Sequence, residues 1–221
     1  MAMMHSAKKW FIEEQAQMVV KSLKKRSYEA VYVPSAKEAC EKVIQALQPG
    51  QIIGTGGSIT LNETGILDKI RSCNYTLIDP DSHLSEGVSS DKIEELRREV
   101  LSKSDVFITS INALTLDGKM VSIDGLGNRL AAMLHGSPHK VIVVCGVNKI
   151  VPDLEQALWR AHNVAAVCNV KRLNMNPPCS KALECVDCSS EERICRATLI
   201  LEKQPIGKEY LVIIIGEHCG F

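Results

Sequence analysis

Four of the nine cysteines stand close together and carry the clearest chemical signal in the chain. Cys179, Cys185, Cys188 and Cys195 are separated by five, two and six residues. Four thiolates bind Zn²⁺ tetrahedrally or hold an iron–sulfur cluster, and a Cys-x-x-Cys pair can turn both sulfurs towards one ion. We therefore expect a metal site, with a [4Fe–4S] cluster and Zn²⁺ both open, because the spacing matches neither a bacterial ferredoxin nor a zinc ribbon. Buried free thiols, or a redox disulfide between Cys185 and Cys188, are the alternatives.

A glycine-rich run between a predicted strand and a predicted helix is the second candidate site. It has the sequence GTGGS and contains Gly54, Gly56, Gly57 and Ser58. Glycines let the backbone approach a ligand closely, and free N–H groups at a helix start favour a phosphate or a carboxylate. The run matches neither Gly-x-Gly-x-x-Gly nor the P-loop, so dinucleotide or nucleoside triphosphate binding is not expected. A tight strand-to-helix turn without a ligand is the alternative.

A second predicted helix start follows the strand expected at 119–123. It contains Asp124, Gly125, Asn128 and Arg129. A carboxylate, an amide and a guanidinium at this point would form the opposite wall of a cleft, since clefts in such sheets lie beyond the carboxyl ends of parallel strands. The alternative is a glycine-rich turn that the aspartate caps.

Two further charged residues are expected near the same edge. Lys149 follows the strand predicted at 140–144, so its amine would meet an anionic ligand, whereas an exposed loop lysine is the alternative. Glu63 lies five residues after Ser58, where a solvated helix glutamate is the alternative. If the chain is an independent enzyme, Glu63 or Asp124 would be its general base.

The elements that must position these residues belong to a globular chain. It has 221 residues, 45% of them hydrophobic and 24% charged, with 26 basic and 26 acidic side chains. The apolar content excludes disorder, and zero net charge with few aromatic residues argues against a nucleic-acid binder. No apolar run is long enough for a signal peptide or a membrane span. The uneven cysteine spacing is also unlike the disulfide framework of a small secreted domain, so we expect a protein of the reducing cytoplasm, where clustered thiols more often bind metal or do redox work.

Short apolar strands alternate with amphipathic helices along most of the chain. The expected strands are 30–33, 51–53, 75–78, 105–110, 119–123 and 140–144, and the expected helices are 7–26, 36–47, 58–70, 91–103, 126–135 and 152–163. This rhythm predicts an α/β fold with a mainly parallel sheet flanked by helices. Two further apolar runs, 197–202 and 210–215, predict a C-terminal β-hairpin. We expect an N-terminal helix in 1–27 and a single α/β domain in 28–221, with an inserted cysteine-rich loop at 175–196.

Several of these motifs together resemble one protein family. They are Thr109–Thr115 with Asp117-Gly118, Asp124–Arg129, Val141–Val144 with Gly146–Ile150, and, at lower specificity, Lys8–Ala16, Gly54–Ser58 and Glu202–Pro205. The pattern is similar to the LUD-domain proteins, the lactate-utilisation family once described as a domain of unknown function. The similarity covers nearly the whole chain.

The resemblance implies a fold and a function. The fold would be similar to the sugar-phosphate isomerase and CoA-transferase superfamily (NagB/RpiA/CoA-transferase-like), whose glycine loop and Asp-Gly or Asn-Arg edge surround a phosphorylated or CoA-like ligand. The function would be a subunit or accessory enzyme of L-lactate oxidation to pyruvate, binding a small organic anion beside iron–sulfur partner subunits. The four-cysteine loop departs from the short lactate-utilisation subunit and would mark a subgroup that carries its own metal.

Two other interpretations stay open. A stand-alone isomerase, ligase or transferase would act on a phosphorylated or CoA-like substrate and use the four-cysteine site only as a structural metal site. A non-catalytic regulatory or scaffold protein would use its N-terminal helix for assembly, for example as a homo-oligomer.

Overall fold

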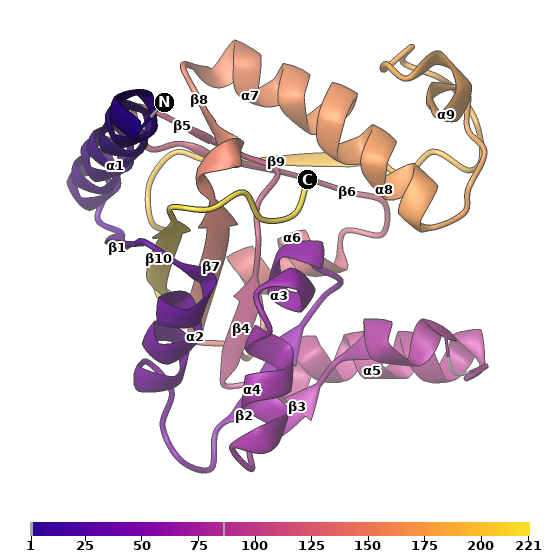
Figure 1. Cartoon of the computed structure of the whole chain (residues 1–221). Helices are drawn as coiled ribbons and strands as arrows, with labels where there is room; N and C mark the ends of the chain where they lie inside the picture. Colours follow the sequence, from indigo (N-terminus) through magenta and orange to yellow (C-terminus); the bar gives the residue numbers. More distant parts are fainter. Residues whose placement is uncertain (1, 86) are drawn as a thin grey trace.

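The computed structural model describes residues 2–85 and 87–221, which form two β-sheets with helices packed on them (Figure 1). The strands are β1 (Glu29–Val33), β2 (Ile52–Thr55), β3 (Thr76–Ile78), β4 (Val106–Thr109), β5 (Ala113–Thr115), β6 (Met120–Asp124), β7 (Lys140–Gly146), β8 (Ile150–Val151), β9 (Ala197–Leu201) and β10 (Glu209–Ile215). The α-helices are α1 (Ala2–Lys25), α2 (Ala36–Gln45), α3 (Ile59–Glu63), α4 (Ile66–Ser72), α5 (Ser90–Lys103), α6 (Asn128–Leu134), α7 (Leu154–Arg160), α8 (Ala166–Arg172) and α9 (Cys179–Ala182). Two 3₁₀ turns, η1 (Pro80–Ser85) and η2 (Val147–Lys149), and a π-helical turn, η3 (Ala161–Ala165), complete the elements.

The larger sheet has six parallel strands in the order β1-β10-β7-β4-β2-β3. In its central strand β7, Val141 and Val143 face α1, α5 and α6, whereas Ile142 and Val144 face α2, α3 and α4. Because parallel sheets are covered on both faces, such strands are almost continuously apolar. The predicted α/β class with a mainly parallel sheet flanked by helices is thereby confirmed. No helix in the described part of the chain is both long and apolar enough to cross a membrane.

The smaller sheet has four strands in the order β8-β5-β6-β9 and was not expected as a separate sheet. Strands β5 and β6 form a tight antiparallel hairpin. On one face Leu114 and Met120 join the core with Leu23 of α1, and on the other Val121 packs with Ala157 of α7 and Ala161 of η3. The helix α1 is therefore part of the folded domain, held between the two sheets.

The predicted C-terminal hairpin is wrong. Strand β9 pairs antiparallel with β6 in the smaller sheet, whereas β10 lies between β1 and β7 in the larger one. The physical reason lies in the apolar run 210–215, whose residues are all buried. Such a run suits a central parallel strand covered on both faces, whereas a hairpin on the surface would expose one face of it to water.

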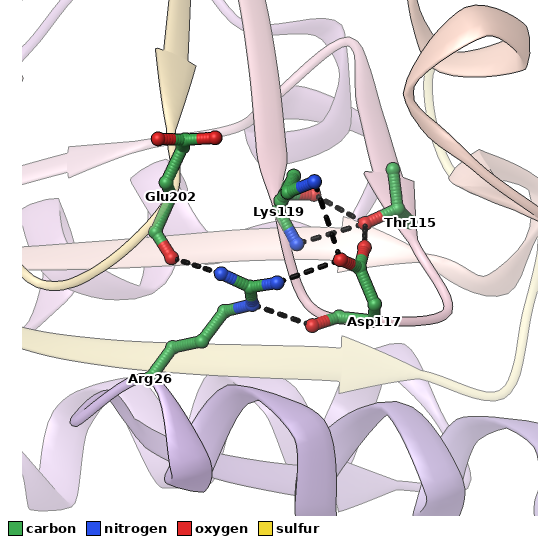
Figure 2. Close-up of polar contacts among 5 residues, drawn as sticks. All are labelled: Arg26, Thr115, Asp117, Lys119 and Glu202. Carbon is green, nitrogen blue, oxygen red and sulfur yellow. Dashed lines mark hydrogen bonds and ion pairs between the residues drawn. The ribbon is translucent and has the colours of Figure 1, made fainter.

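A cluster of polar contacts fixes the end of α1 to the smaller sheet (Figure 2). The Arg26 guanidinium donates to the carbonyl oxygen and a carboxylate oxygen of Asp117 and to the carbonyl of Glu202, each at 2.6 Å. Thr115 Oγ1 donates to the same carboxylate, and Lys119 Nζ lies 3.4 Å from it. Desolvation opposes ionisation of Asp117, but the Thr115 hydrogen bond and the Arg26 charge lower its pKa overall. The Asp-Gly turn therefore anchors the N-terminal helix.

Candidate functional site

A cavity of about 510 Å³ lies beyond the carboxyl ends of β2, β4, β6 and β7. The topology of parallel strands predicts a ligand site at this edge. The predicted residues that line it are Gly56, Gly57, Ser58, Asp124, Gly125, Asn128, Arg129 and Lys149. Segments far apart in the chain, predicted separately as two walls of a cleft, thus meet around one space.

The glycines of the first loop are needed because charged side chains approach them. A Cβ on Gly56 would lie 2.7 Å from Cγ of Arg129, and one on Gly57 would lie 2.1 Å from a carboxylate oxygen of Asp81. Gly54 does not line the cavity. A Cβ there would lie 2.4 Å from Oγ of Ser104 at the end of α5, so Gly54 allows that helix end to pack on β2.

Asp124 holds the second loop in place. Its carboxylate accepts hydrogen bonds from the backbone N–H groups of Leu126 (3.3 Å) and Arg129 (3.1 Å), and the Arg129 guanidinium lies 3.5 Å from it. Arg129 also donates to the carbonyl of Ile123 at 2.6 Å. The Asp124 carboxylate is 9% exposed and already accepts hydrogen bonds from these donors. This arrangement suits a residue that positions Arg129. It suits a general base less well, because a base needs a free carboxylate oxygen.

Lys149 forms the floor of the cavity and is 3% exposed. Its ammonium donates to Oγ1 of Thr60 (2.9 Å), Oγ of Ser110 (3.0 Å) and the carbonyl of Ile111 (3.1 Å). Burial lowers its pKa to about 8 against a usual 10.5. Within the described residues no carboxylate forms an ion pair with this amine. An ammonium has three protons, and these three hydrogen bonds use all of them, so Lys149 could act on a ligand only through its charge and through the hydroxyls that it orients.

Glu63 is not brought to the cavity lining. Its carboxylate accepts a hydrogen bond from the backbone N–H of Gly220 at 2.6 Å. Asn148 holds the same segment, since its side chain donates to the carbonyl of Gly220 (2.9 Å) and accepts from the N–H of Cys219 (3.1 Å). Glu63 and Asn148 thus fix the segment 219–220 beside the cavity.

Four arginines at the cavity were not predicted from the sequence. They are Arg97, Arg172, Arg193 and Arg196. With the two predicted cations they make six positive side chains on the lining, against the three acidic ones Asp81, Asp124 and Glu191. Three cation–carboxylate pairs lie within the lining, namely Arg129–Asp124 (3.5 Å), Arg172–Asp81 (3.9 Å) and Arg196–Glu191 (3.6 Å). Arg193 and Arg97 pair with carboxylates outside the lining, those of Asp187 (2.9 Å) and Glu94 (3.6 Å). Lys149 is left as the lining cation with no carboxylate partner among the described residues, and its charge favours an anionic ligand.

The predicted metal-binding cysteines lie in the loop that forms one wall of this cavity. All four thiols are free and half-buried. Burial raises the pKa of the Cys179 thiol, and the nearby thiols of Cys188, Cys195 and Cys185 raise it further. No group of three or more potential ligands in the described residues is already arranged around a metal position. The donor set itself suits Zn²⁺ or an iron–sulfur cluster.

One solved structure supports the architecture over nearly the whole chain. The crystal structure of a DUF162 family protein from Deinococcus radiodurans is similar over 94% of this chain and 98% of that chain, with a TM-score of 0.52 and 14% sequence identity. Crystal structures of eIF2B beta and eIF2B delta from Chaetomium thermophilum match at TM-scores of 0.37 and 0.36 and identities of 13% and 17%. These matches cover 55% and 64% of this chain, and 44% and 54% of those chains. No curated protein was found to match.

A protein-family model also matches most of the chain. The LUD domain family matches residues 16–215, which include both loops of the cavity, Lys149 and the four-cysteine loop. This confirms the resemblance that the central motifs indicated. The chain belongs to the LUD-domain family.

Proposed function

We propose that the chain binds a small organic anion in the cavity and serves as a lactate-utilisation-type subunit or accessory enzyme in the oxidation of L-lactate to pyruvate. The single observation that carries the anion-binding part is the ammonium of Lys149, which is buried at the cavity floor without a carboxylate partner among the described residues. Burying a charge is costly unless an opposite charge approaches it. A bound carboxylate would supply that opposite charge.

The side chains suggest how a 2-hydroxy or 2-oxo acid would be held. Arg129 and Arg193 line the cavity, and their guanidinium groups, which already lie 3.5 Å from Asp124 and 2.9 Å from Asp187, would also contact a bound carboxylate. The Ser110 hydroxyl, oriented by Lys149 at 3.0 Å, would contact the oxygen on the adjacent carbon. Oxidation of lactate removes two electrons and two protons, and under this proposal the electrons leave to iron–sulfur partner subunits. These residues would bind and orient the acid.

We further propose that Cys179, Cys185, Cys188 and Cys195 hold a metal, either a [4Fe–4S] cluster or Zn²⁺. A cluster would pass electrons, whereas zinc would only hold the loop. The free thiols suit a reducing cytoplasm. Anaerobic purification followed by iron, zinc and acid-labile sulfide quantification distinguishes the two. Iron and sulfide in similar amounts indicate a cluster, zinc at about one per chain indicates a structural ion, and neither metal contradicts the site.

The size of the cavity favours a second candidate function. A space of about 510 Å³ falls in the range of pockets that hold drug-sized ligands and exceeds what lactate would fill. A phosphorylated or CoA-like substrate would use more of the arginines, in an isomerase, ligase or transferase with a purely structural metal. In that reaction Asp124 or Glu63 would be the general base, which requires the hydrogen bonds of either carboxylate to rearrange.

A thermal-shift screen separates the two functions. The full chain is heated with L-lactate, pyruvate, coenzyme A or ribose 5-phosphate, and the same screen is run on Gly56→Val, whose added atoms would collide with Arg129. Stabilisation by lactate or pyruvate that the variant loses supports the lactate-utilisation role. Stabilisation only by coenzyme A or ribose 5-phosphate, again lost in the variant, supports the second function. No stabilisation by any of the four contradicts anion binding.

A further inference from the structure

The cavity wall between Pro178 and Arg196 is built without an apolar core. None of the residues in this described segment is buried, and Leu183 and Val186 are 74% and 48% exposed. Its only helix is the four-residue α9. A segment that buries so little apolar surface gains little free energy to offset the entropy lost on ordering. Small units of this kind are usually held by disulfides or metals, and the four half-buried thiols lie within this one.

Arg193 connects the cysteines to the cavity. It donates to the carbonyl of Cys188 at 2.7 Å and to the carbonyl of Cys195 at 3.1 Å, so it spans the peptides of two of the four thiols. The same side chain lines the cavity, and its own carbonyl accepts from the Arg196 guanidinium at 2.9 Å. A movement of either cysteine would therefore move the cationic groups that face a bound anion.

The loop is also in contact with the fixed part of the site. The N–H of Cys185 donates to the side chain of Asn163 in η3 at 2.9 Å. A Cβ on Gly125 would lie 3.1 Å from the carbonyl oxygen of Ile194, so the second glycine loop lies directly against the wall. The two contacts tie a change in the loop to η3 and to the second glycine loop.

We propose that the four-cysteine loop is a metal-dependent wall of the cavity: a thiophilic cation bound by the four thiolates sets Arg193 and Arg196 against the anion and raises the affinity for it. This inference rests on the proposed anion binding and adds its regulation. The described thiols are not yet arranged around one point, so loading requires the loop to adjust. A centre of four thiolates and Zn²⁺ is itself anionic, and Arg193, which also pairs with Asp187 at 2.9 Å, would lie beside it. Because linkage is reciprocal, the anion raises metal affinity by the same factor.

The test compares metal-stripped and zinc-loaded full chain. Pyruvate and, separately, coenzyme A are titrated into both forms by calorimetry, with Zn²⁺ as the only metal. We expect about one Zn²⁺ per chain and at least one of the two anions binding about tenfold more tightly to the loaded form. Cys188→Ser should bind both anions like the stripped protein, whereas Cys73→Ser, a cysteine in neither the loop nor the cavity lining, should behave like the wild type. If Cys188→Ser does not fold, the stripped wild type still gives the comparison.

Arg193→Gln tests the connection itself. It should keep about one Zn²⁺ per chain but lose the difference in affinity between the loaded and stripped forms. Equal affinity in both forms of the wild type would overturn the inference and leave the proposed function standing, as would anion binding by a chain that takes up no zinc. Zinc loading without binding of either anion would overturn both the inference and the anion-binding proposal.

Discussion

The floor and the wall of the cavity are built by opposite means. On the floor, Lys149 and Asp124 are almost fully buried. Lys149 donates to Ser110 just after β4, and Asp124 accepts from the backbone N–H of Arg129 at the start of α6. On the wall, the segment 178–196 has no buried residue and is held mainly by arginine contacts with carbonyls. Ordering a residue costs about 1–2 kcal/mol, and only the floor buries enough surface to offset this. The fold alone therefore positions the floor, whereas under our proposal a metal bound by the four thiols would hold the wall.

Loss of a proposed metal ligand should disorder the wall, residues 178–196, and leave the structure of the floor unchanged. In Cys188→Ser we expect metal content to fall from about one per chain to near zero, and trypsin cleavage after Lys181 or Arg193 to quicken by on the order of tenfold or more, since local opening exposes the loop. Limited proteolysis with mass spectrometry locates the cuts. Cys73→Ser is the matched control. Equal cleavage rates in the two variants would show that the wall does not depend on the thiols.

Removing the positive charge of Lys149 should greatly weaken anion binding without changing the metal content. Lys149→Met takes away the buried ammonium, and truncating a buried charge that faces a ligand costs about 2–3 kcal/mol, or about a hundredfold in affinity. Calorimetric titration of pyruvate or coenzyme A measures this, with metal content as a second readout. Lys181→Met, an exposed lysine on the wall outside the cavity lining, is the control. Unchanged affinity in Lys149→Met would show that Lys149 does not take part in anion binding.

Asp124→Ala should have a smaller effect that falls on both stability and binding. The change frees the backbone N–H groups at the start of α6 and releases Arg129, which we expect to cost about 1–2 kcal/mol and to lower the Tm by roughly 2–8 °C. Asp153→Ala removes the cap of α7, where the carboxylate accepts from the N–H of Gln156 at 2.9 Å. It should lower the Tm similarly but leave anion affinity unchanged. If both variants bind anions equally well, Asp124 does not position Arg129 for the ligand.

Sequence patterns predicted the parts of this molecule that depend on local order. The six-stranded sheet followed from the alternation of strands and helices, and the meeting of the first glycine loop with Lys149 followed from strand edges, because parallel strands end on one side of a sheet. The second glycine loop was predicted at the same cleft, but it comes from β6 of the smaller sheet, which pairs antiparallel with its neighbours. The smaller sheet was missed because β5 has three residues and β8 has two, too few for an alternation to show. The prediction of a C-terminal hairpin was wrong because the two neighbouring apolar runs, 197–202 and 210–215, belong to different sheets.

The arginines of the cavity show the other limit. Arg97, Arg172 and Arg193 come from α5, from α8 and from the cysteine loop, and nothing local marks a solvated arginine that will face a cavity. Glu63 was expected at the same edge as the glycine loop from its spacing to Ser58 alone, but its carboxylate accepts a hydrogen bond from the 219–220 segment. Long-range packing determines where such side chains lie, so only the three-dimensional structure shows their positions.

The number of protons taken up when an anion binds tests most directly whether the buried Lys149 amine meets that anion. The pKa of Lys149 is lowered to about 8, and a bound anion favours the charged amine, so binding near pH 8.5 should take up a fraction of a proton. Calorimetry of pyruvate or coenzyme A in two buffers of different ionisation enthalpy measures that uptake. We expect proton uptake and an affinity that falls by up to about tenfold per pH unit above pH 8. Both effects should be absent in Lys149→Met. Binding without proton uptake, or with the same pH dependence in that variant, would contradict the proposed role of Lys149 in binding the anion.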